Sequence, residues 1–362
     1  MHMIRRITGP AALAALVIAS ITVPQPTVLA AAQKKVPAAK KAAAAAPLAW
    51  PLPPDVARVR HLTTYRGVDD FKVRKTARWK NLLLGDDDTD RPSDTMVKPY
   101  GIAVSATGRV YVTDTAARRV FVFDPDAKTV TFIGENGAGK LTKPTGIAID
   151  DEGKVFIADA TLNRVFGYAP DGSLLVAIGH DGELQSPSGL ATDPRQKLLY
   201  VADSSHHQIF CYSTVDGSSV RTMGKRGSEP GEFNFPTNLF VDGQGQLYVA
   251  DTLNFRIQVF APDGQVLRTF GVQGDGPGAF NRPKGVAVDS EGHIYVVDTS
   301  FNNFQIFDPD GTLLLFVGRG GREPGEFLLP AGLYIDAHDR IYVADQGNAR
   351  VQVFQYQHVD GQ

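Results

Sequence analysis

Apolar residues in this chain fall into short runs of about four to six, from residue 98 to residue 356. The runs alternate only in part between apolar and polar positions, as expected for strands in sheets that pack face to face. Turn-forming residues separate them, for example the Asp-Asp-Glu-Gly phrase at 150–153. The pattern predicts an all-β fold built from many short strands.

One unit recurs six times along this region. Each unit opens with a proline that is followed two residues later by glycine, or by Asn238 in the fourth unit. The six prolines are Pro99, Pro144, Pro187, Pro236, Pro283 and Pro330, at spacings of 45, 43, 49, 47 and 47 residues. Each unit then continues through a strand that ends in aspartate, a short loop, a third strand, a turn and a fourth strand. Four short strands in each of six units predict a six-bladed β-propeller of four-stranded blades.

The ends of the repeat array predict how the ring closes. The sixth unit stops after its third strand, and only the tail 357–362 follows Tyr356. Residues 58–67, which precede the first unit, resemble a fourth strand, so we expect this N-terminal strand to complete the last blade. A ring leaves no sheet face exposed, whereas a linear stack would leave two. The propeller repeats span 98–356. Residues 68–97 belong to no repeat and form an insertion, in which Lys72 to Leu84 is a candidate short helix.

The N-terminus has a different composition. Residues 1–30 combine a basic head, an apolar stretch from Ile7 to Val23 and small residues near Ala30, which is the pattern of a secretory signal peptide. The alternative is an uncleaved membrane anchor, for which this stretch is short. Residues 31–57, rich in Ala, Lys and Pro, predict a linker. We therefore expect an exported protein, periplasmic or extracellular, whose mature chain has no stable membrane span.

The phrases at 143–165 and 282–299 resemble NHL repeats, as do the linking phrases Gly-Ser-Glu-Pro-Gly-Glu-Phe and Gly-Arg-Glu-Pro-Gly-Glu-Phe. The resemblance covers all six units, from about Val59 to Tyr356. WD40 repeats fit poorly, because neither Trp50 nor Trp79 lies in a unit. The resemblance implies a propeller that binds protein, or RNA in some animal proteins. A minority of similar propellers are enzymes, namely peptide-amidating lyases and lactonases of the gluconolactonase type.

The aspartates that end the second strands are candidate loop acids or candidate ligands of a hard cation. They are Asp114, Asp159, Asp203, Asp251, Asp298 and Asp345. Because they occur in every unit, the structural role is favoured: an aspartate at the start of a tight loop accepts its own loop's N–H groups. Arginines five residues later are expected to offset their charge in four units. These arginines are Arg119, Arg164, Arg256 and Arg350.

A functional site is expected to break the sixfold symmetry, because one ligand cannot contact six blades alike. Three sets of residues do so. The third unit carries His206 and His207 in its loop, which are candidate metal ligands or a pH-responsive patch, although NHL loops often carry a histidine there. The fifth carries Phe301 and Asn302. Around the central channel, Tyr100, Lys284 and Asn238 are the candidate ligand-binding residues, with a solvated channel wall as the alternative.

We expect a monomeric binding platform for a protein, peptide or glycan partner, because the repeats are regular and no catalytic motif is found. A net charge of −2 gives no indication of a nucleic-acid partner. The alternative is a metal-dependent enzyme, amidating-lyase-like or gluconolactonase-like, with its site at the channel mouth. For this alternative the cofactor candidates are Ca²⁺ and Zn²⁺. No residue is assigned as catalytic or as a metal ligand, and the Gly85 to Asp90 stretch lacks the later ligands of an EF-hand loop.

Overall fold

The computed structural model describes residues 48–52, 54–71 and 93–358. The predicted signal peptide (1–30), most of the predicted linker and the candidate helix Lys72 to Leu84 lie outside the described residues. Within the described part of the chain, no helix is long and apolar enough to cross a membrane.

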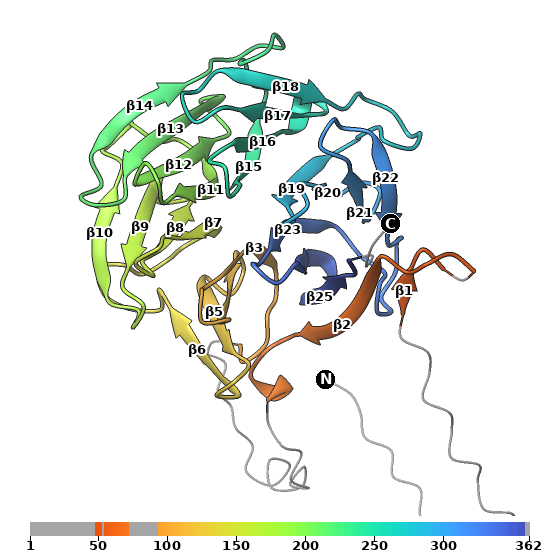
Figure 1. The fold of residues 1–362 in the computed structure, drawn as a ribbon. Coiled ribbons are helices and arrows are strands. Elements are labelled where there is room, and N and C mark those ends of the chain that lie inside the picture. Colours follow the sequence, from red (N-terminus) through yellow and green to blue (C-terminus); the bar gives the residue numbers. More distant parts are fainter. Residues whose placement is uncertain (1–47, 53, 72–92, 359–362) are drawn as a thin grey trace, which may run out of the picture. The chain divides into compact units, whose positions relative to one another are not determined.

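Six antiparallel sheets are arranged around a central channel, which confirms the predicted six-bladed propeller (Figure 1). Blade 1 contains β3 (Pro99–Val104), β4 (Val110–Asp114), β5 (Arg119–Asp124) and β6 (Thr129–Ile133). Blade 2 contains β7 (Pro144–Ile149), β8 (Val155–Asp159), β9 (Arg164–Tyr168) and β10 (Leu174–Ile178). Blade 3 contains β11 (Pro187–Asp193), β12 (Leu198–Asp203), β13 (Gln208–Ser213) and β14 (Ser219–Met223). Blade 4 contains β15 (Pro236–Val241), β16 (Leu247–Asp251), β17 (Arg256–Phe260) and β18 (Val266–Phe270). Blade 5 contains β19 (Pro283–Val288), β20 (Ile294–Asp298), β21 (Asn303–Phe307) and β22 (Leu313–Val317).

The last blade joins the two ends of the described chain. Blade 6 contains β23 (Pro330–Ile335), β24 (Arg340–Asp345), β25 (Arg350–Tyr356) and, as its fourth strand, β2 (Val59–Tyr65). Strand β2 pairs antiparallel with β25, from Val59 opposite Tyr356 to Tyr65 opposite Val351. The N-terminal strand therefore completes the ring, as expected from the sequence.

A feature that the sequence pattern did not predict is β1 (Ala49–Trp50), which adds a fifth strand to blade 6 from within the expected linker. The Trp50 ring packs edge-on against Phe354, with 5.7 Å between ring centroids. Three short 3₁₀ helices complete the described elements: η1 (Val68–Asp70), η2 (Thr252–Asn254) and η3 (Gln346–Asn348).

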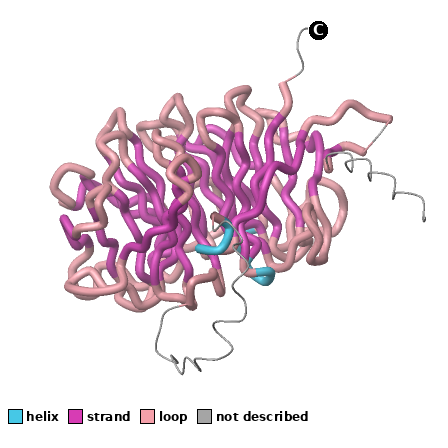
Figure 2. The backbone as a smooth tube through the Cα atoms, turned by 90° about the horizontal axis from the view of Figure 1, so that it is seen from below, coloured by secondary structure: helices cyan, strands magenta, loops and turns pink. Residues whose placement is uncertain are grey.

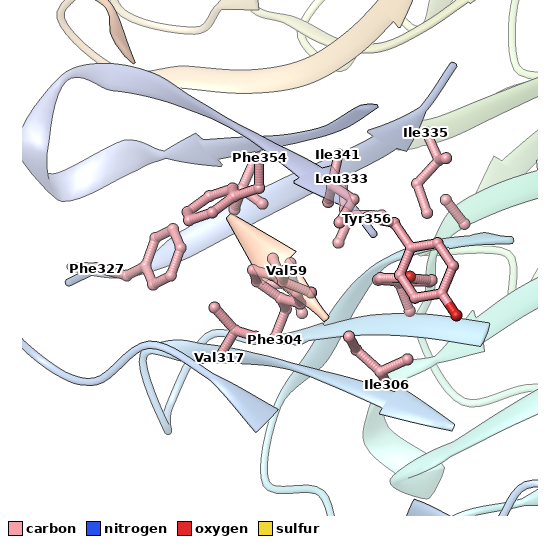
Figure 3. Packing of buried hydrophobic residues seen from close by; sticks show 14 residues of the cluster. Val59, Phe304, Ile306, Val317, Phe327, Leu333, Ile335, Ile341, Phe354 and Tyr356 are labelled. Atoms are coloured by element: carbon pink, nitrogen blue, oxygen red, sulfur yellow. The ribbon is translucent and has the colours of Figure 1, made fainter. Parts of the chain in front are cut away.

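The core lies between neighbouring blades, because the second and third strands of each sheet are apolar on both faces. In the cluster between blades 5 and 6, Val59 from β2 packs with Phe304, Phe327 and Phe354, all fully buried (Figure 3). Seen from the side, the strands run between two layers of loops (Figure 2). The loops that follow the second strands, with their aspartates, therefore all belong to one layer.

The glycine of the opening Pro-x-Gly phrase is required by the close approach of the innermost strands. A Cβ atom at Gly101 or Gly146 would collide with the backbone of the next blade, and one at Gly332 would collide with the Tyr100 carbonyl. In blade 4 this position is Asn238, whose side chain enters the channel cavity. The sixfold pattern is thus broken inside the channel.

Candidate binding site at the channel mouth

The six loop aspartates are fully buried and engaged by their own surroundings. The Asp114 carboxylate accepts hydrogen bonds from the backbone N–H groups of Val97, Lys98, Ala116 and Ala117 at 2.6–3.0 Å. The carboxylates of Asp159, Asp203 and Asp298 each accept hydrogen bonds from four backbone N–H groups in the same way. These carboxylates bridge the loop after the second strand and the segment before the first strand.

Blades 4 and 6 replace part of this backbone binding with side chains. Asp345 accepts one backbone N–H group, from Leu328, and side-chain N–H groups from Asn348, Arg350 and Gln352. Asp251 has the corresponding partners in blade 4, with Arg256 Nε at 2.9 Å. The expectation that arginines offset the aspartate charge is correct for these two blades. In blades 1 and 2 it is wrong, because Arg119, which is buried, and Arg164 pair with Glu135 and Asp181 instead.

The adjacent histidines of blade 3 do not converge on a shared ligand position. His207 is buried, and its Nδ1 accepts the N–H of Phe235 at 3.1 Å while its ring packs edge-on against the Phe235 ring. Burial lowers the pKa of His207, which favours the neutral ring that can accept this hydrogen bond. His206 lies beside Asp203, with Nδ1 3.3 Å from the carboxylate.

Asn302 occupies the loop position that His207 has in blade 3. Both residues have positive φ angles, 54° and 57°. The Asn302 side-chain oxygen accepts the N–H of Leu329 in the next blade at 2.8 Å. Asn302 and His207 therefore link adjacent blades through equivalent bonds, whereas Phe301 lines a pocket on blade 5.

The six residues that directly follow the opening prolines differ in the contacts that they make. Thr145 donates hydrogen bonds to Ala158 and Pro187, and Ser188 donates to Ala202 and Pro236. Of the remaining members, the Thr237 hydroxyl bonds the Thr252 hydroxyl, and Ala331 is fully buried with no polar group. The last two members are Tyr100 and Lys284, and the Lys284 Nζ lies 5.2 Å from the centroid of the Tyr100 ring.

The electrostatic environment of Lys284 is cationic. Its pKa falls from 10.5 to about 8, first because of burial and then because of the nearby charges of Arg282 and Lys98. Burial also raises the pKa of Tyr100 to about 12, so its hydroxyl stays protonated at neutral pH. The channel mouth therefore presents N–H and O–H donors to any ligand that enters. Within the described residues, no acid contributes to the Lys284 shift.

A cavity of about 150 Å³ lies in the channel, between the innermost strands of five blades. The Asn238 Nδ2 is buried there without a hydrogen-bond partner among the described residues. Phe240 and Tyr334 face each other across the channel, with 6.4 Å between ring centroids. The Asn238 amide therefore provides a hydrogen-bond donor without a partner among the described residues, in addition to the donors of Lys284 and Tyr100 at the channel mouth.

The metal-dependent enzyme that is the alternative function would need a set of metal-ligating side chains. In the part of the chain that the structure describes, no three His, Cys, Asp or Glu side chains are placed to hold a metal ion. The loop acids are engaged by N–H groups, and the channel is lined by donors and apolar groups. The described residues do not fit a bound Ca²⁺ or Zn²⁺ ion.

Arg282 and Lys98 also contribute to the channel mouth, although they are not among the residues predicted from the sequence. Each stands immediately before an opening proline, so its position in the repeat was visible. Phe240 and Tyr334 were also missed; each lies four residues after its opening proline. The signal that would have found all four is variation among the six repeats at positions flanking the Pro-x-Gly phrase.

The fold and the channel define a six-bladed propeller of the kind shared by repeat proteins and a group of lactonases and lyases. The chain belongs to the SMP-30/gluconolactonase/LRE-like family, whose profile matches residues 67–180 and 176–277. The NHL repeat profile matches residues 280–307 and 327–354, in blades 5 and 6. The resemblance to NHL repeats is thereby confirmed.

Curated relatives match short stretches only. A 41-residue stretch is 54% identical to the E3 ubiquitin-protein ligase TRIM32 of Homo sapiens and covers 11% of this chain and 6% of that protein. A 92-residue stretch is 36% identical to NHL repeat-containing protein 2 of Gallus gallus and covers 22% of this chain and 12% of that protein. The chain thus matches a small part of the length of these relatives.

Similar solved structures show the fold. Virginiamycin B lyase from Staphylococcus aureus has a TM-score of 0.52 at 13% identity, covering 72% of this chain and 96% of that chain. A gluconolactonase from Xanthomonas campestris has a TM-score of 0.55 at 20% identity, covering 72% of this chain and 87% of that chain. At these identities the likeness extends to the architecture alone.

Proposed function

We propose that this protein is a monomeric binding platform that receives an anionic group of a protein, peptide or glycan partner at the Tyr100–Lys284 end of the channel. The observation that carries the proposal is the cluster of Lys284, Arg282 and Lys98 at the channel mouth. None of the three pairs with a carboxylate among the described residues, and an anion would offset their mutual repulsion. The loop acids are already engaged and serve as scaffold.

The direct test measures binding of a hexaglutamate peptide to the full chain by fluorescence anisotropy. Wild-type protein should bind at pH 7 and bind more weakly above pH 8, where Lys284 loses its proton. Lys284→Met should weaken binding by about tenfold, which is the loss of about 1.4 kcal/mol. Lys140→Met, at an exposed outer turn, is the matched control and should bind like wild type. Equal binding by all three proteins would contradict the proposal.

The proposed place of action is outside the cytoplasm, based on the signal-peptide pattern of residues 1–30. N-terminal sequencing of the protein from fractionated cells tests this. A mature N-terminus near Ala31 in the periplasmic or extracellular fraction is the expected result. Retention of residues 1–30 on a cytoplasmic protein would overturn it.

A second candidate function is lactone hydrolysis or lyase chemistry at the same channel, which membership of the SMP-30/gluconolactonase/LRE-like family favours. Because the described residues supply no set of metal ligands, we derive no catalytic step. The test is turnover of a gluconolactone by the purified chain, before and after chelation. Turnover that is lost in Lys284→Met and retained in Lys140→Met would replace the platform proposal.

A further inference from the structure

Blade 5 lacks the arginine of a hydrogen-bond network that blades 4 and 6 share. In blades 4 and 6, five residues after the loop aspartate, stand Arg256 and Arg350. Asn303 stands at this position in blade 5, five residues after Asp298 and two before Gln305. The opening prolines of the three blades are spaced by 47 residues, so equivalent residues of neighbouring blades are also 47 positions apart.

Each of the two arginines lies in a cradle of carbonyl groups from the loop that precedes the opening proline. Arg350 donates to the carbonyl oxygens of Arg322, Glu323 and Glu326 at 2.8–2.9 Å and to Asp345 at 2.6 Å. Arg256 makes the corresponding bonds in blade 4. Its carbonyl partners are Ser228, Glu229 and Glu232, at 2.6–2.9 Å. The cradle thus recognises a guanidinium group in two blades.

The blade 5 loop keeps the backbone of this cradle. Gln273 and Phe280 form the same parallel bridge as Arg226 with Phe233 and Gly320 with Phe327. Gln305 accepts the Gly278 N–H at 3.1 Å and donates to the Ala279 carbonyl at 3.0 Å. Gln258 and Gln352 make the same two bonds in their blades. The carbonyl groups of Asp275 and Gly276 therefore hold the cradle positions, with no guanidinium group supplied by blade 5.

The cradle of blade 5 is an open pocket of about 280 Å³, whose walls include Asp275, Gly276, Phe301, Asn303 and Phe316. The Asn303 Oδ1 is buried and has no hydrogen-bond partner among the described residues. Phe316 is 56% exposed. Phe301 takes the place of the asparagines of blades 4 and 6, and Gly276 and Ala279 take the place of glutamates. These replacements remove the donors and bulk that fill the cradle elsewhere.

We propose that this blade 5 pocket binds a guanidinium group presented by another molecule, either a free arginine derivative or the arginine side chain of a peptide. The Asp275 and Gly276 carbonyls are the acceptors, at the positions of two of the carbonyl groups that bind Arg256 and Arg350. The Asn303 Oδ1 adds an acceptor at the position of the arginine itself. The aromatic faces of Phe301 and Phe316 suit a flat, weakly hydrated cation, and the exposed Asp275 carboxylate supplies the charge. The pocket is separate from the channel mouth and goes beyond the proposed anion site.

The test uses calorimetric titration of the full chain with Nα-acetyl-arginine methylamide and with a short arginine-containing peptide. Wild-type protein should bind in a saturable manner, and the lysine counterparts should bind at least about tenfold more weakly, because an ammonium ion cannot span the cradle. Equal affinity for the two arginine ligands assigns a free derivative. Affinity for the peptide that is about tenfold higher assigns a peptide side chain. No saturable binding of either ligand overturns the proposal.

Two variants locate the site. Asn303→Arg supplies the guanidinium group from blade 5 itself, so it should raise the melting temperature and abolish binding of the arginine ligand. Arg256→Asn opens the cradle of blade 4, so it should lower the melting temperature and gain a second site for the same ligand. Undiminished binding by Asn303→Arg would overturn the assignment even if Arg256→Asn fails to fold.

Discussion

Lys284 and Tyr100 belong to blades 5 and 1, yet the lysine Nζ lies 5.2 Å from the centroid of the tyrosine ring. The innermost strand of blade 6 stands between the two blades in the ring. At the equivalent position this strand carries Ala331, which is fully buried and small enough to leave the contact open. Side chains from two non-adjacent blades therefore form one site across the channel.

Lys284→Met should stabilise the protein at pH 7, by an amount that disappears at high pH. The pKa of Lys284 is lowered from 10.5 to about 8, so between these values the unfolded chain binds more protons than the folded chain. The wild-type free energy of unfolding therefore rises with pH across this window, and the gain from the substitution shrinks. The gain at pH 7 should be on the order of 1–3 kcal/mol. Denaturant unfolding at pH 7, 9 and 10.5 measures it.

The control for this experiment is Lys140→Met, whose stability difference from wild type should not change across the same pH range. A Lys284→Met difference that is equally flat would show that the amine is not desolvated in the folded protein.

Arg350→Met should destabilise the protein by about 3–5 kcal/mol, because it leaves Asp345 buried without its cation and the Arg322 and Glu323 carbonyl groups without their side-chain donor. Arg319→Met removes an exposed arginine that pairs with Glu326 and should cost less than about 1 kcal/mol. Chemical denaturation of both variants gives the comparison. Equal costs would mean that the buried cradle contributes no more than a surface pair.

Gly332→Ala should be destabilising, on the order of 1–3 kcal/mol, because the new methyl group meets the Tyr100 carbonyl of the neighbouring blade. Gly243→Ala is a suitable control: it lies in an exposed turn with nothing within 4 Å of the added carbon. Thermal unfolding of the two variants separates inter-blade packing from the general effect of replacing glycine. A neutral Gly332→Ala would indicate that the inner strands can move apart.

Val59→Asp should weaken ring closure, because a carboxylate would enter the apolar cluster that contains Phe304 and Phe354. We expect a loss of at least about 3 kcal/mol and faster hydrogen exchange in the strand that pairs with β2. Arg60→Asp changes the exposed neighbour in the same strand and should have little effect. If hydrogen exchange in Arg350–Tyr356 is unaltered by Val59→Asp, β2 does not hold the ring closed.

The repeat unit and the ring closure could be predicted from the sequence, because they depend on local strand patterns that are repeated six times. The variable position that Tyr100 and Lys284 occupy in the repeat was visible in the sequence, but their contact across Ala331 depends on the radius of the ring. The partners of Arg119 and Arg164 could not be predicted, because Glu135 and Asp181 lie in loops whose course the repeat does not determine. Strand β1 is two residues long and carries no periodic signal.

The pairing of β2 with β25 also constrains the order of folding. Among the described strands, β1 and β2 are synthesised first and β25 is synthesised last, so the blade that they share cannot form until almost the whole chain has been made. Contacts between such distant segments are slow to form. Blades 1 to 5 can each assemble from neighbouring residues, while completion of blade 6 is the final step that converts an open arc into a ring.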